Sequence, residues 1–222
     1  MILCLVTDRR RLGLAVGARP QDWIEVLQQQ VAGAAKAGVD LIQVREHDLD
    51  AGRLVDLVRS LIGLTANTKA KVLVNDRVDV ALAARASGVH LKEASMPPAE
   101  VRRIVPPGFL IGCSVHSVEA AVARKAADFL VAGTVMPTAS KSAVEYLGKD
   151  GLQRIVQVAA GQPVIGIGGL DIPSIPILAA SCAAGMAAVG TLIPAAGGDV
   201  SEFVQKRVKD LRFALETASS GT

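Results

Sequence analysis

Two glycine-containing segments in the last third of the sequence carry the residue types of a phosphate-binding site. Gly168 and Gly169 follow the apolar run Pro163–Ile167, and Gly190 and Thr191 follow the next apolar run. Glycine lets backbone N–H groups approach a phosphate closely, and the start of a following helix adds its dipole. The glycine pair alone is weak evidence, because tight turns also use glycine. The two segments together predict a phosphate site.

Further polar groups could hold a second phosphate or a diphosphate. Thr138, Ser140 and Lys141 place two hydroxyls and a point charge on one segment, for which a solvated loop is the alternative interpretation. Gln43 and Arg45 alternate along an apolar run, so both side chains are expected on the same side of a strand. An arginine buried there requires an anionic partner, supplied by the protein or by a ligand.

Carboxylate and imidazole groups supply candidates for metal binding and proton transfer. Asp76 is the best candidate for a metal ligand, because Mg²⁺ takes carboxylate and substrate phosphate oxygens. His116 follows Ser114 at the end of an apolar run and is a candidate general acid or base. His90 lies within an apolar run, which favours a hydrogen-bonded core histidine, and the role of His47 stays open.

The elements that must position these residues alternate along the chain. Most of the short runs are continuous in Val, Ile and Leu, which is typical of parallel strands covered on both faces. The expected strands are Ile2–Val6, Leu41–Val44, Lys71–Val74, Gly88–Leu91, Leu110–Ser114, Phe129–Ala132, Pro163–Ile167 and Ala187–Val189. The expected helices are Trp23–Ala37, one beginning at Asp50, Asp79–Ala86, one beginning at Pro97-Pro98, Val118–Ala126, Lys149–Ala160, Ile172–Ala183 and Ser201–Ala218.

Eight strands, each followed by a helix, predict an α/β fold with a single (β/α)8 TIM barrel. A doubly wound parallel sheet is the alternative. No linker or low-complexity tract divides the sequence, so one domain is expected over residues 1–222, with residues 219–222 as a frayed tail. In such a barrel the active site forms where the strands end. The polar residues described above are therefore expected to meet there.

Composition excludes several classes of protein. The chain is 50% apolar and only 20% charged, which excludes disorder, and it lacks an apolar stretch long enough to cross a membrane. With 3% aromatic residues and a net charge of +3, it has no platform for stacking nucleic-acid bases. Cys4, Cys113 and Cys182 all lie in apolar stretches and are expected to be buried, which agrees with a cytoplasmic location. Small phosphate compounds remain the expected partners, and the sequence leaves a homo-oligomer open.

Six segments in order resemble the thiamine phosphate synthase / TenI family. The resemblance spans residues 2–195, and the segments that carry it are Gln43–Glu46, Asn75–Leu82, Gly88–Leu91, Gly112–Ser117, Pro137–Lys141 and Ile165–Gly169. The resemblance implies one of two reactions on the same barrel. The synthase joins hydroxymethylpyrimidine diphosphate to a thiazole phosphate, with Mg²⁺ assisting the loss of diphosphate. The tautomerase, of TenI type, shifts a proton in a thiazole phosphate and needs neither metal nor diphosphate.

The synthase pattern implies a role for each matching residue. It places the diphosphate on Arg45, Asn75 and Lys141, the pyrimidine near Gln43 and Ser114, Mg²⁺ on Asp76, and the thiazole phosphate at Gly168-Gly169 and Gly190-Thr191. A side chain at Gly169 is then expected to weaken phosphate binding without disturbing the fold. The tautomerase pattern instead makes His116 the proton-transfer residue.

Two departures from the synthase pattern leave the choice open. His47 stands where the family usually has Lys, and Ser95 stands where it usually has the Asp that is the second Mg²⁺ ligand. Glu93 is a candidate replacement for that carboxylate. The departures favour the tautomerase, whereas Asn75, Asp76 and the Thr138–Lys141 segment favour the synthase. We therefore expect a synthase first, a tautomerase second and a non-catalytic phosphate-binding protein third.

Overall fold

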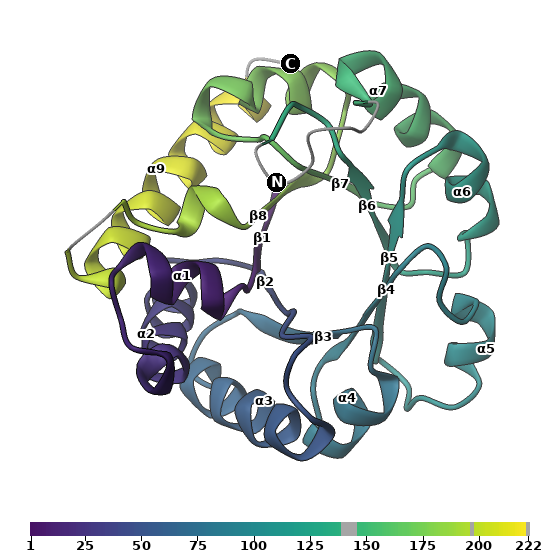
Figure 1. Ribbon diagram of the computed structural model, residues 1–222. Helices are drawn as coiled ribbons and strands as arrows, with labels where there is room; N and C mark the ends of the chain where they lie inside the picture. Colours follow the sequence, from purple (N-terminus) through teal and green to yellow (C-terminus); the bar gives the residue numbers. More distant parts are fainter. Residues whose placement is uncertain (139–145, 196–197, 221–222) are drawn as a thin grey trace.

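Eight parallel strands close into a barrel in the computed structural model, which describes residues 1–138, 146–195 and 198–220 (Figure 1). The strands are β1 (Ile2–Val6), β2 (Leu41–Val44), β3 (Lys71–Asn75), β4 (Gly88–Leu91), β5 (Leu110–Val115), β6 (Phe129–Gly133), β7 (Val164–Ile167) and β8 (Gly185–Ala188). Each pairs in parallel with its neighbour in sequence, and β8 returns to β1. The predicted (β/α)8 barrel is confirmed, and the doubly wound sheet is excluded.

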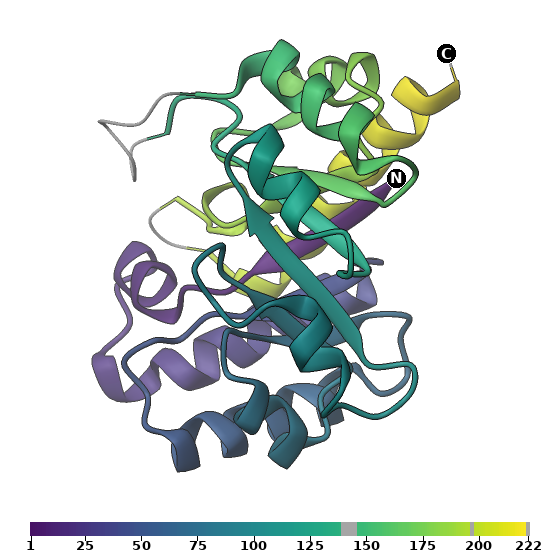
Figure 2. The ribbon, with the colours of Figure 1, turned by 90° about the vertical axis from the view of Figure 1, so that its right-hand side faces the viewer.

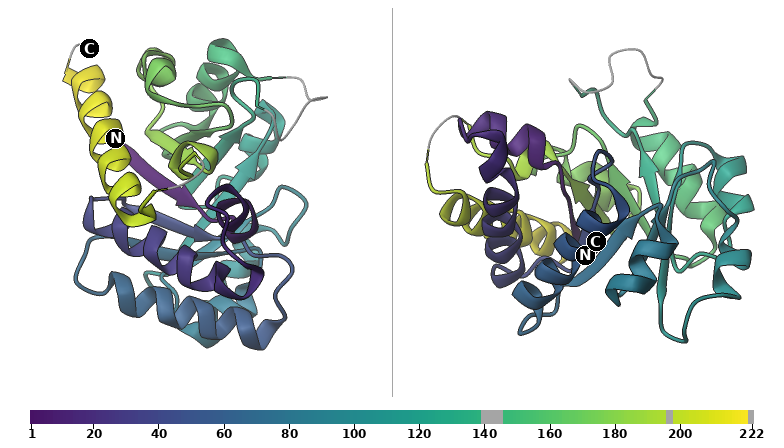
Figure 3. Two further views of the ribbon diagram at one scale, coloured as in Figure 1. Left: turned by 60° about the vertical axis from the view of Figure 1, so that its left-hand side comes forward. Right: turned by 60° about the horizontal axis from the view of Figure 1, so that its bottom comes forward.

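Helices surround the strands on the outside (Figures 1 and 2). They are α1 (Arg9–Ala15), α2 (Trp23–Lys36), α3 (Ala51–Thr65), α4 (Val78–Ala84), α5 (Pro98–Arg102), α6 (Val118–Ala123), α7 (Gly148–Ala159), α8 (Ile175–Ala180) and α9 (Val200–Ser220), with 3-10 turns η1 (Pro20–Asp22), η2 (Ile172–Ser174) and η3 (Gly190–Leu192). Figure 3 shows α9 alongside α2, where a Cβ on Gly33 would lie 3.0 Å from the Ser201 carbonyl oxygen. Within the described residues, no helix has the length and apolar character needed to cross a membrane.

The barrel interior is filled by alternate residues of the strands. Its apolar layer consists of Cys4, Val6, Leu41, Leu73, Phe129, Val131, Ile165 and Ala187. The Phe129 ring on β6 covers Gly112, its partner in register on the neighbouring strand β5, where an added Cβ would lie 2.2 Å from the ring. The other alternate residues pack against the helices in the larger core. The strand period therefore determines which side chains reach the open end of the barrel.

Helix α1 was not among the expected helices. Its first turn carries three arginines rather than an apolar face, so periodicity did not reveal it. Asp8 begins the helix, because its side chain accepts a hydrogen bond from the Arg11 backbone N–H at 3.0 Å.

Two further expectations are corrected at β8 and Cys182. Strand β8 begins at Gly185, two residues before the expected start, because β1 approaches so closely that a Cβ there would lie 1.9 Å from the Ile2 carbonyl oxygen. Cys182 is exposed, in a left-handed conformation with φ 55°, whereas Cys4 and Cys113 are buried as expected. The turn after α8 turns Cys182 outward although its sequence neighbours are apolar.

A buried ion pair fixes the segment that follows β2. The Arg9 guanidinium lies 2.9 Å from Glu46 Oε2 and contacts both oxygens of Asp48 at 2.7 Å. The Thr7 hydroxyl donates to Glu46 Oε1 at 2.6 Å and accepts from the Arg45 backbone N–H at 2.9 Å. Burial raises the pKa of Glu46, although Thr7 and Arg9 oppose the shift. The network thus links β1 and α1 to the backbone that carries Arg45.

We expect Arg9→Met to lower the free energy of unfolding by about 3–5 kcal/mol, because it leaves the Glu46 carboxylate buried without its cation. Urea unfolding at pH 7, followed by circular dichroism, measures the change. Arg10→Met is the matched control, since Arg10 is exposed and makes only a long ion pair with Asp48, at 3.8 Å. This change should lower the free energy of unfolding by less than about 1 kcal/mol. Equal losses in the two variants would contradict the role of the buried pair.

Candidate active site

Four polar side chains form a layer above the apolar interior, at the ends of neighbouring strands. They are Gln43 on β2, Asn75 on β3, His90 on β4 and Ser114 on β5. Asn75 is paired in register with His90, and Gln43 and Asn75 each lie two residues beyond an interior leucine. The predicted convergence of Gln43, Asn75 and Ser114 at one end of the barrel is therefore what the strand register produces.

Asn75 carries a buried donor without a partner. Its Nδ2 atom makes no hydrogen bond to any described residue, although the side chain is buried. Leaving such a group unpaired costs about 1–3 kcal/mol, and buried amides in proteins are otherwise almost always bonded. An acceptor supplied by a ligand would remove this cost.

His90 is a buried neutral imidazole. Its Nε2 lies 2.8 Å from Ser114 Oγ, and its ring packs 6.2 Å from Phe129. Burial lowers the pKa of His90 to about 4, so the ring is uncharged at neutral pH. It fixes the Ser114 hydroxyl and is the core histidine that the sequence predicts.

Arg45 differs from the expected buried arginine. It lies one residue beyond β2 and is exposed, although Gln43 on the same strand is buried. Because Arg45 is exposed, it does not need the anionic partner that burial would have required. No carboxylate among the described residues lies within 4 Å of its guanidinium. Its charge is close enough to the His47 side chain to lower the pKa of that group.

Asp76 lies at the centre of a three-residue cluster. Its backbone is left-handed, with φ 65°, and its N–H donates to the His90 carbonyl at 2.8 Å. One carboxylate oxygen lies 2.7 Å from Lys92 Nζ, and the other accepts from the Ser95 hydroxyl. Burial acts to raise the pKa of Asp76, but the bonds from Lys92 and Ser95 together hold it below its usual value.

The cluster does not fit the Mg²⁺ site that the resemblance implies. Both oxygens of Asp76 already have partners, and Ser95 supplies no second charge. Glu93, considered above as a replacement, is directed at His116 instead. Nowhere in the described part of the chain do three or more His, Cys, Asp or Glu side chains gather as metal ligands would. We therefore derive no step through a metal.

Glu93 and His116 form a carboxylate–imidazole pair. Glu93 Oε2 lies 2.7 Å from His116 Nδ1 and also accepts the His116 backbone N–H at 2.9 Å. The Arg124 guanidinium donates to the Glu93 carbonyl, which ties the segment after β4 to α6 and the turn that follows it. A carboxylate on Nδ1 leaves Nε2 as the reactive nitrogen. The sequence identified His116, but it did not reveal its partner, because the two residues lie on different loops.

The glycines after β7 are in the backbone conformations that a close turn requires. Gly168 and Gly169 have φ of 98° and 66°. A Cβ on Gly169 would lie 2.4 Å from the Pro137 carbonyl oxygen, so a larger residue would displace backbone. The expectation that Gly169→Val leaves the fold intact is therefore wrong.

The segment after β8 lies beside a cation that the sequence did not single out. A Cβ on Gly190 would lie 2.7 Å from a guanidinium nitrogen of Arg11, which α1 presents there. The Thr191 hydroxyl donates to the Leu170 carbonyl at 2.8 Å, which couples the β8 turn to the β7 turn. In the segment after β6, Thr138 is half-buried, whereas Ser140 and Lys141 lie outside the described residues.

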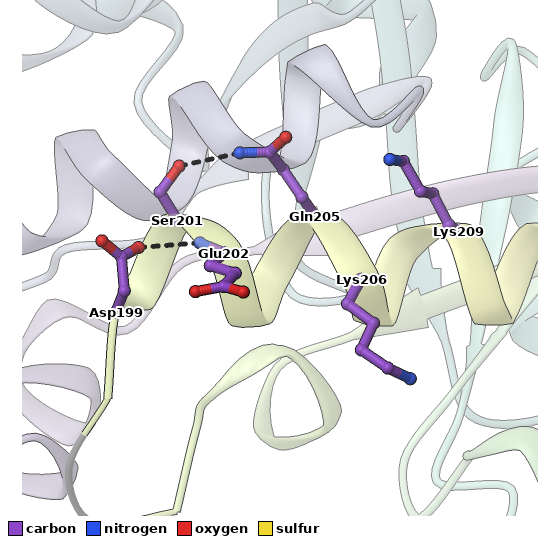
Figure 4. A pocket seen from close by; sticks show the side chains of 6 residues that line it. All are labelled: Asp199, Ser201, Glu202, Gln205, Lys206 and Lys209. Carbon is purple, nitrogen blue, oxygen red and sulfur yellow. Dashed lines mark hydrogen bonds between the residues drawn. The ribbon is translucent and has the colours of Figure 1, made fainter.

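Two hollows differ in chemical character. One of about 110 Å³ lies at the strand ends, and its lining includes His47, Asn75, Asp76 and Lys92. The other, of about 430 Å³, follows the surface of α9 from Asp199 to Lys209 and is drawn in Figure 4. Its side chains bond within the helix itself, as Gln205 does to Ser201 at 3.1 Å. The smaller hollow, where several strands contribute, is the candidate site.

We expect His90 to stay neutral down to about pH 4 in the folded protein. The pKa of His90 in the folded protein lies below that of an exposed histidine, so the unfolded chain binds more protons between pH 6.5 and 4. The free energy of unfolding must therefore decrease as the pH is lowered through that window. NMR titration of the ring protons measures the pKa directly, with His90→Gln assigning the signal. A His90 ring that titrates near pH 6.5 would contradict the described burial.

Comparisons with known proteins agree with this geometry. The family model described as thiamine monophosphate synthase matches residues 3–192. A relative in Geobacter sulfurreducens, which carries the thiamine-phosphate synthase name provisionally, is 41% identical over 86% of this chain and 86% of its own. The thiamine-phosphate synthase of Pyrococcus abyssi is 33% identical over 96% of this chain and 94% of its own.

A solved structure extends the likeness to three dimensions. Thiamine phosphate pyrophosphorylase from Pyrococcus furiosus superposes with a TM-score of 0.77 at 32% identity, covering 98% of this chain and 96% of that one. The family match spans all eight strands and the whole candidate site. The chain belongs to the thiamine monophosphate synthase family.

Proposed function

We propose that this protein is a thiamine phosphate synthase, which joins hydroxymethylpyrimidine diphosphate to a thiazole phosphate and releases diphosphate. The observation that carries the proposal is the unpaired Asn75 amide at an opening that also holds Arg45 and Lys92. Two cations and a free donor at the strand ends favour a polyanionic ligand.

The reaction transfers an alkyl group. The bond between the pyrimidine methylene carbon and the diphosphate oxygen breaks with its electron pair on oxygen, and the thiazole nitrogen bonds to the carbon. Arg45 and the Asn75 amide would stabilise the charge that develops on the departing oxygens. Gln43 and Ser114, on the interior layer, are placed to hydrogen-bond the pyrimidine ring.

The thiazole phosphate is assigned to the turns after β7 and β8. Gly168 and Gly169 bring backbone there, and Arg11 adds a positive charge beside Gly190. In this proposal the second substrate would bind across the barrel opening from the β2–β4 cations. Lys141, predicted to contact the diphosphate, keeps that role as part of the proposal.

Incubation with both substrates tests the proposal. Thiamine phosphate and diphosphate should appear in equal amounts, and each should require both substrates. Absence of both products, with and without Mg²⁺, would refute the synthase assignment.

A second candidate function is favoured by the Glu93–His116 pair. This reaction would shift one proton within the thiazole phosphate to make the ring aromatic. A carboxylate 2.7 Å from Nδ1 is the arrangement that supports an imidazole acting as base and then as acid. This tautomerase reaction would use the same phosphate turns but neither Arg45 nor Asn75.

We expect Arg45→Ala to lower kcat/KM for thiamine phosphate formation by about 10²–10³, because it removes a cation from the leaving diphosphate. Arg45→Lys should recover part of the rate. Arg53→Ala is the control, because it changes an exposed arginine of α3 that pairs with the helix-capping residue Asp50. Its kcat/KM should match that of the wild type. An unchanged kcat/KM in Arg45→Ala would remove this residue from the site.

His116→Asn distinguishes the two reactions, because Asn cannot move a proton. If the protein is a tautomerase, hydrogen exchange into the thiazole phosphate in D₂O, followed by NMR, should fall by about 10²–10⁴. Glu93→Gln should give a smaller loss, and thiamine phosphate formation should be insensitive to both changes. Exchange that continues unaltered in His116→Asn would exclude the second candidate.

A further inference from the structure

The β2–β4 opening holds cationic side chains beside the Asp76 carboxylate. Lys92 and Asp76 line the hollow, and Arg45 lies close enough to lower the pKa of His47, which also lines it. Of the other ionisable groups that line the hollow, Glu46 is bound by Arg9, and Arg77 is paired with Asp79 at 2.6 Å. Burial and then the charges of Arg45 and Lys92 lower the pKa of His47, so it is neutral at pH 7. A divalent cation on Asp76 would have to displace the Lys92 ammonium group that is already bound to this carboxylate.

Lys92 occupies the position that a metal ion would need. Its Nζ lies 2.7 Å from Asp76 Oδ2, and Ser95 binds the other carboxylate oxygen. The Lys92 backbone N–H also donates to Ser95 Oγ at 3.1 Å, so the turn after β4 closes on the same carboxylate. The three residues form a self-contained unit in which the Lys92 ammonium group neutralises Asp76.

The ion pair between Lys92 and Asp76 is too exposed to contribute much to the stability of the fold. The Lys92 side chain is 52% exposed, and ion pairs of this kind contribute at most about 1 kcal/mol. The charge therefore remains available to a ligand above it, while Asp76, in its left-handed backbone conformation, holds the ammonium at the opening.

We propose that Lys92 takes the place of the divalent cation, so that this protein binds and releases diphosphate without Mg²⁺. The inference rests on the proposed synthase function. As the carbon–oxygen bond breaks, the electron pair passes to the diphosphate oxygen, and Lys92 and Arg45 face the added charge. No proton transfer or redox step is required. Asp76 acts as a positioning residue through Lys92.

Isothermal titration calorimetry with inorganic diphosphate tests the inference in the presence of EDTA. The wild type should bind under these conditions, and Lys92→Gln should weaken the affinity by about tenfold or more. Lys69→Gln is a matched control, because Lys69 pairs with Asp40 at 2.9 Å with a similarly exposed side chain before β3, at the opposite end of the barrel. It should leave the affinity unchanged.

A second variant keeps the test independent of Lys92 alone. Lys92→Gln combined with Ser95→Asp removes the ammonium and creates two neighbouring carboxylates, and its diphosphate binding should become dependent on Mg²⁺. Binding of Mn²⁺, observed by electron paramagnetic resonance without substrate, should appear in the double variant and not in the wild type. Wild-type diphosphate binding that needs Mg²⁺, or that survives Lys92→Gln unchanged, would overturn the inference.

Turnover measured in parallel separates this inference from the proposed function. Thiamine phosphate formation that requires Mg²⁺ would overturn the role of Lys92 and leave the synthase assignment standing. Diphosphate binding in EDTA without any thiamine phosphate formation would support the Lys92 site and refute the synthase assignment.

Discussion

The buried contact between Arg9 and Glu46 fixes the backbone that carries Arg45 at the edge of the barrel opening. Glu46 follows directly on Arg45, and its carboxylate is held from β1 and α1 by Thr7 and Arg9. Because Thr7 also accepts the Arg45 backbone N–H, the backbone beneath Arg45 cannot shift without breaking a buried charge pair. An exposed arginine thus sits on a rigid base, which is what a group that must meet a charged ligand requires.

The rest of the opening follows from strand register and from the ion pair between Asp76 and Lys92. Asn75 and His90 are paired across β3 and β4, which places a free amide beside a neutral imidazole. Asp76 comes next and is neutralised by Lys92. An unpaired acid in that position would attract metal ions, whereas the charge of Asp76 is already balanced by the Lys92 ammonium group. The account of catalysis therefore depends on which cation Asp76 holds.

Much of the barrel could be predicted from the sequence, because continuous apolar runs mark buried parallel strands. The expected bounds of β1, β2 and β4 agree with the structure, and the β3, β5 and β6 bounds differ by a single residue at the carboxyl end. The start of β8 was predicted two residues too late, because Gly185 has no apolar side chain to mark it. Gly185 belongs to the strand because of its contact with β1. Helix α1 was missed because it begins with a cap and three arginines.

The strand-end residues were predictable for the same reason, whereas their partners were not. Gln43, Asn75 and Ser114 follow from the periodicity of two along each strand. The pairs Lys92–Asp76 and Glu93–His116 join residues on different loops, and no local pattern specifies which acid meets which base. The neighbouring residues Lys92 and Glu93 bind different partners, so the spacing of residues alone could not distinguish a metal ligand from the partner of an imidazole.

A crystal structure of the protein soaked with inorganic diphosphate and EDTA tests the central claim most directly. The account predicts that one phosphate group of the diphosphate lies within hydrogen-bond distance of Asn75 Nδ2 and Lys92 Nζ. The other phosphate group should contact the Arg45 guanidinium. Diphosphate bound away from these three residues, or bound through an ordered metal ion on Asp76, would contradict it.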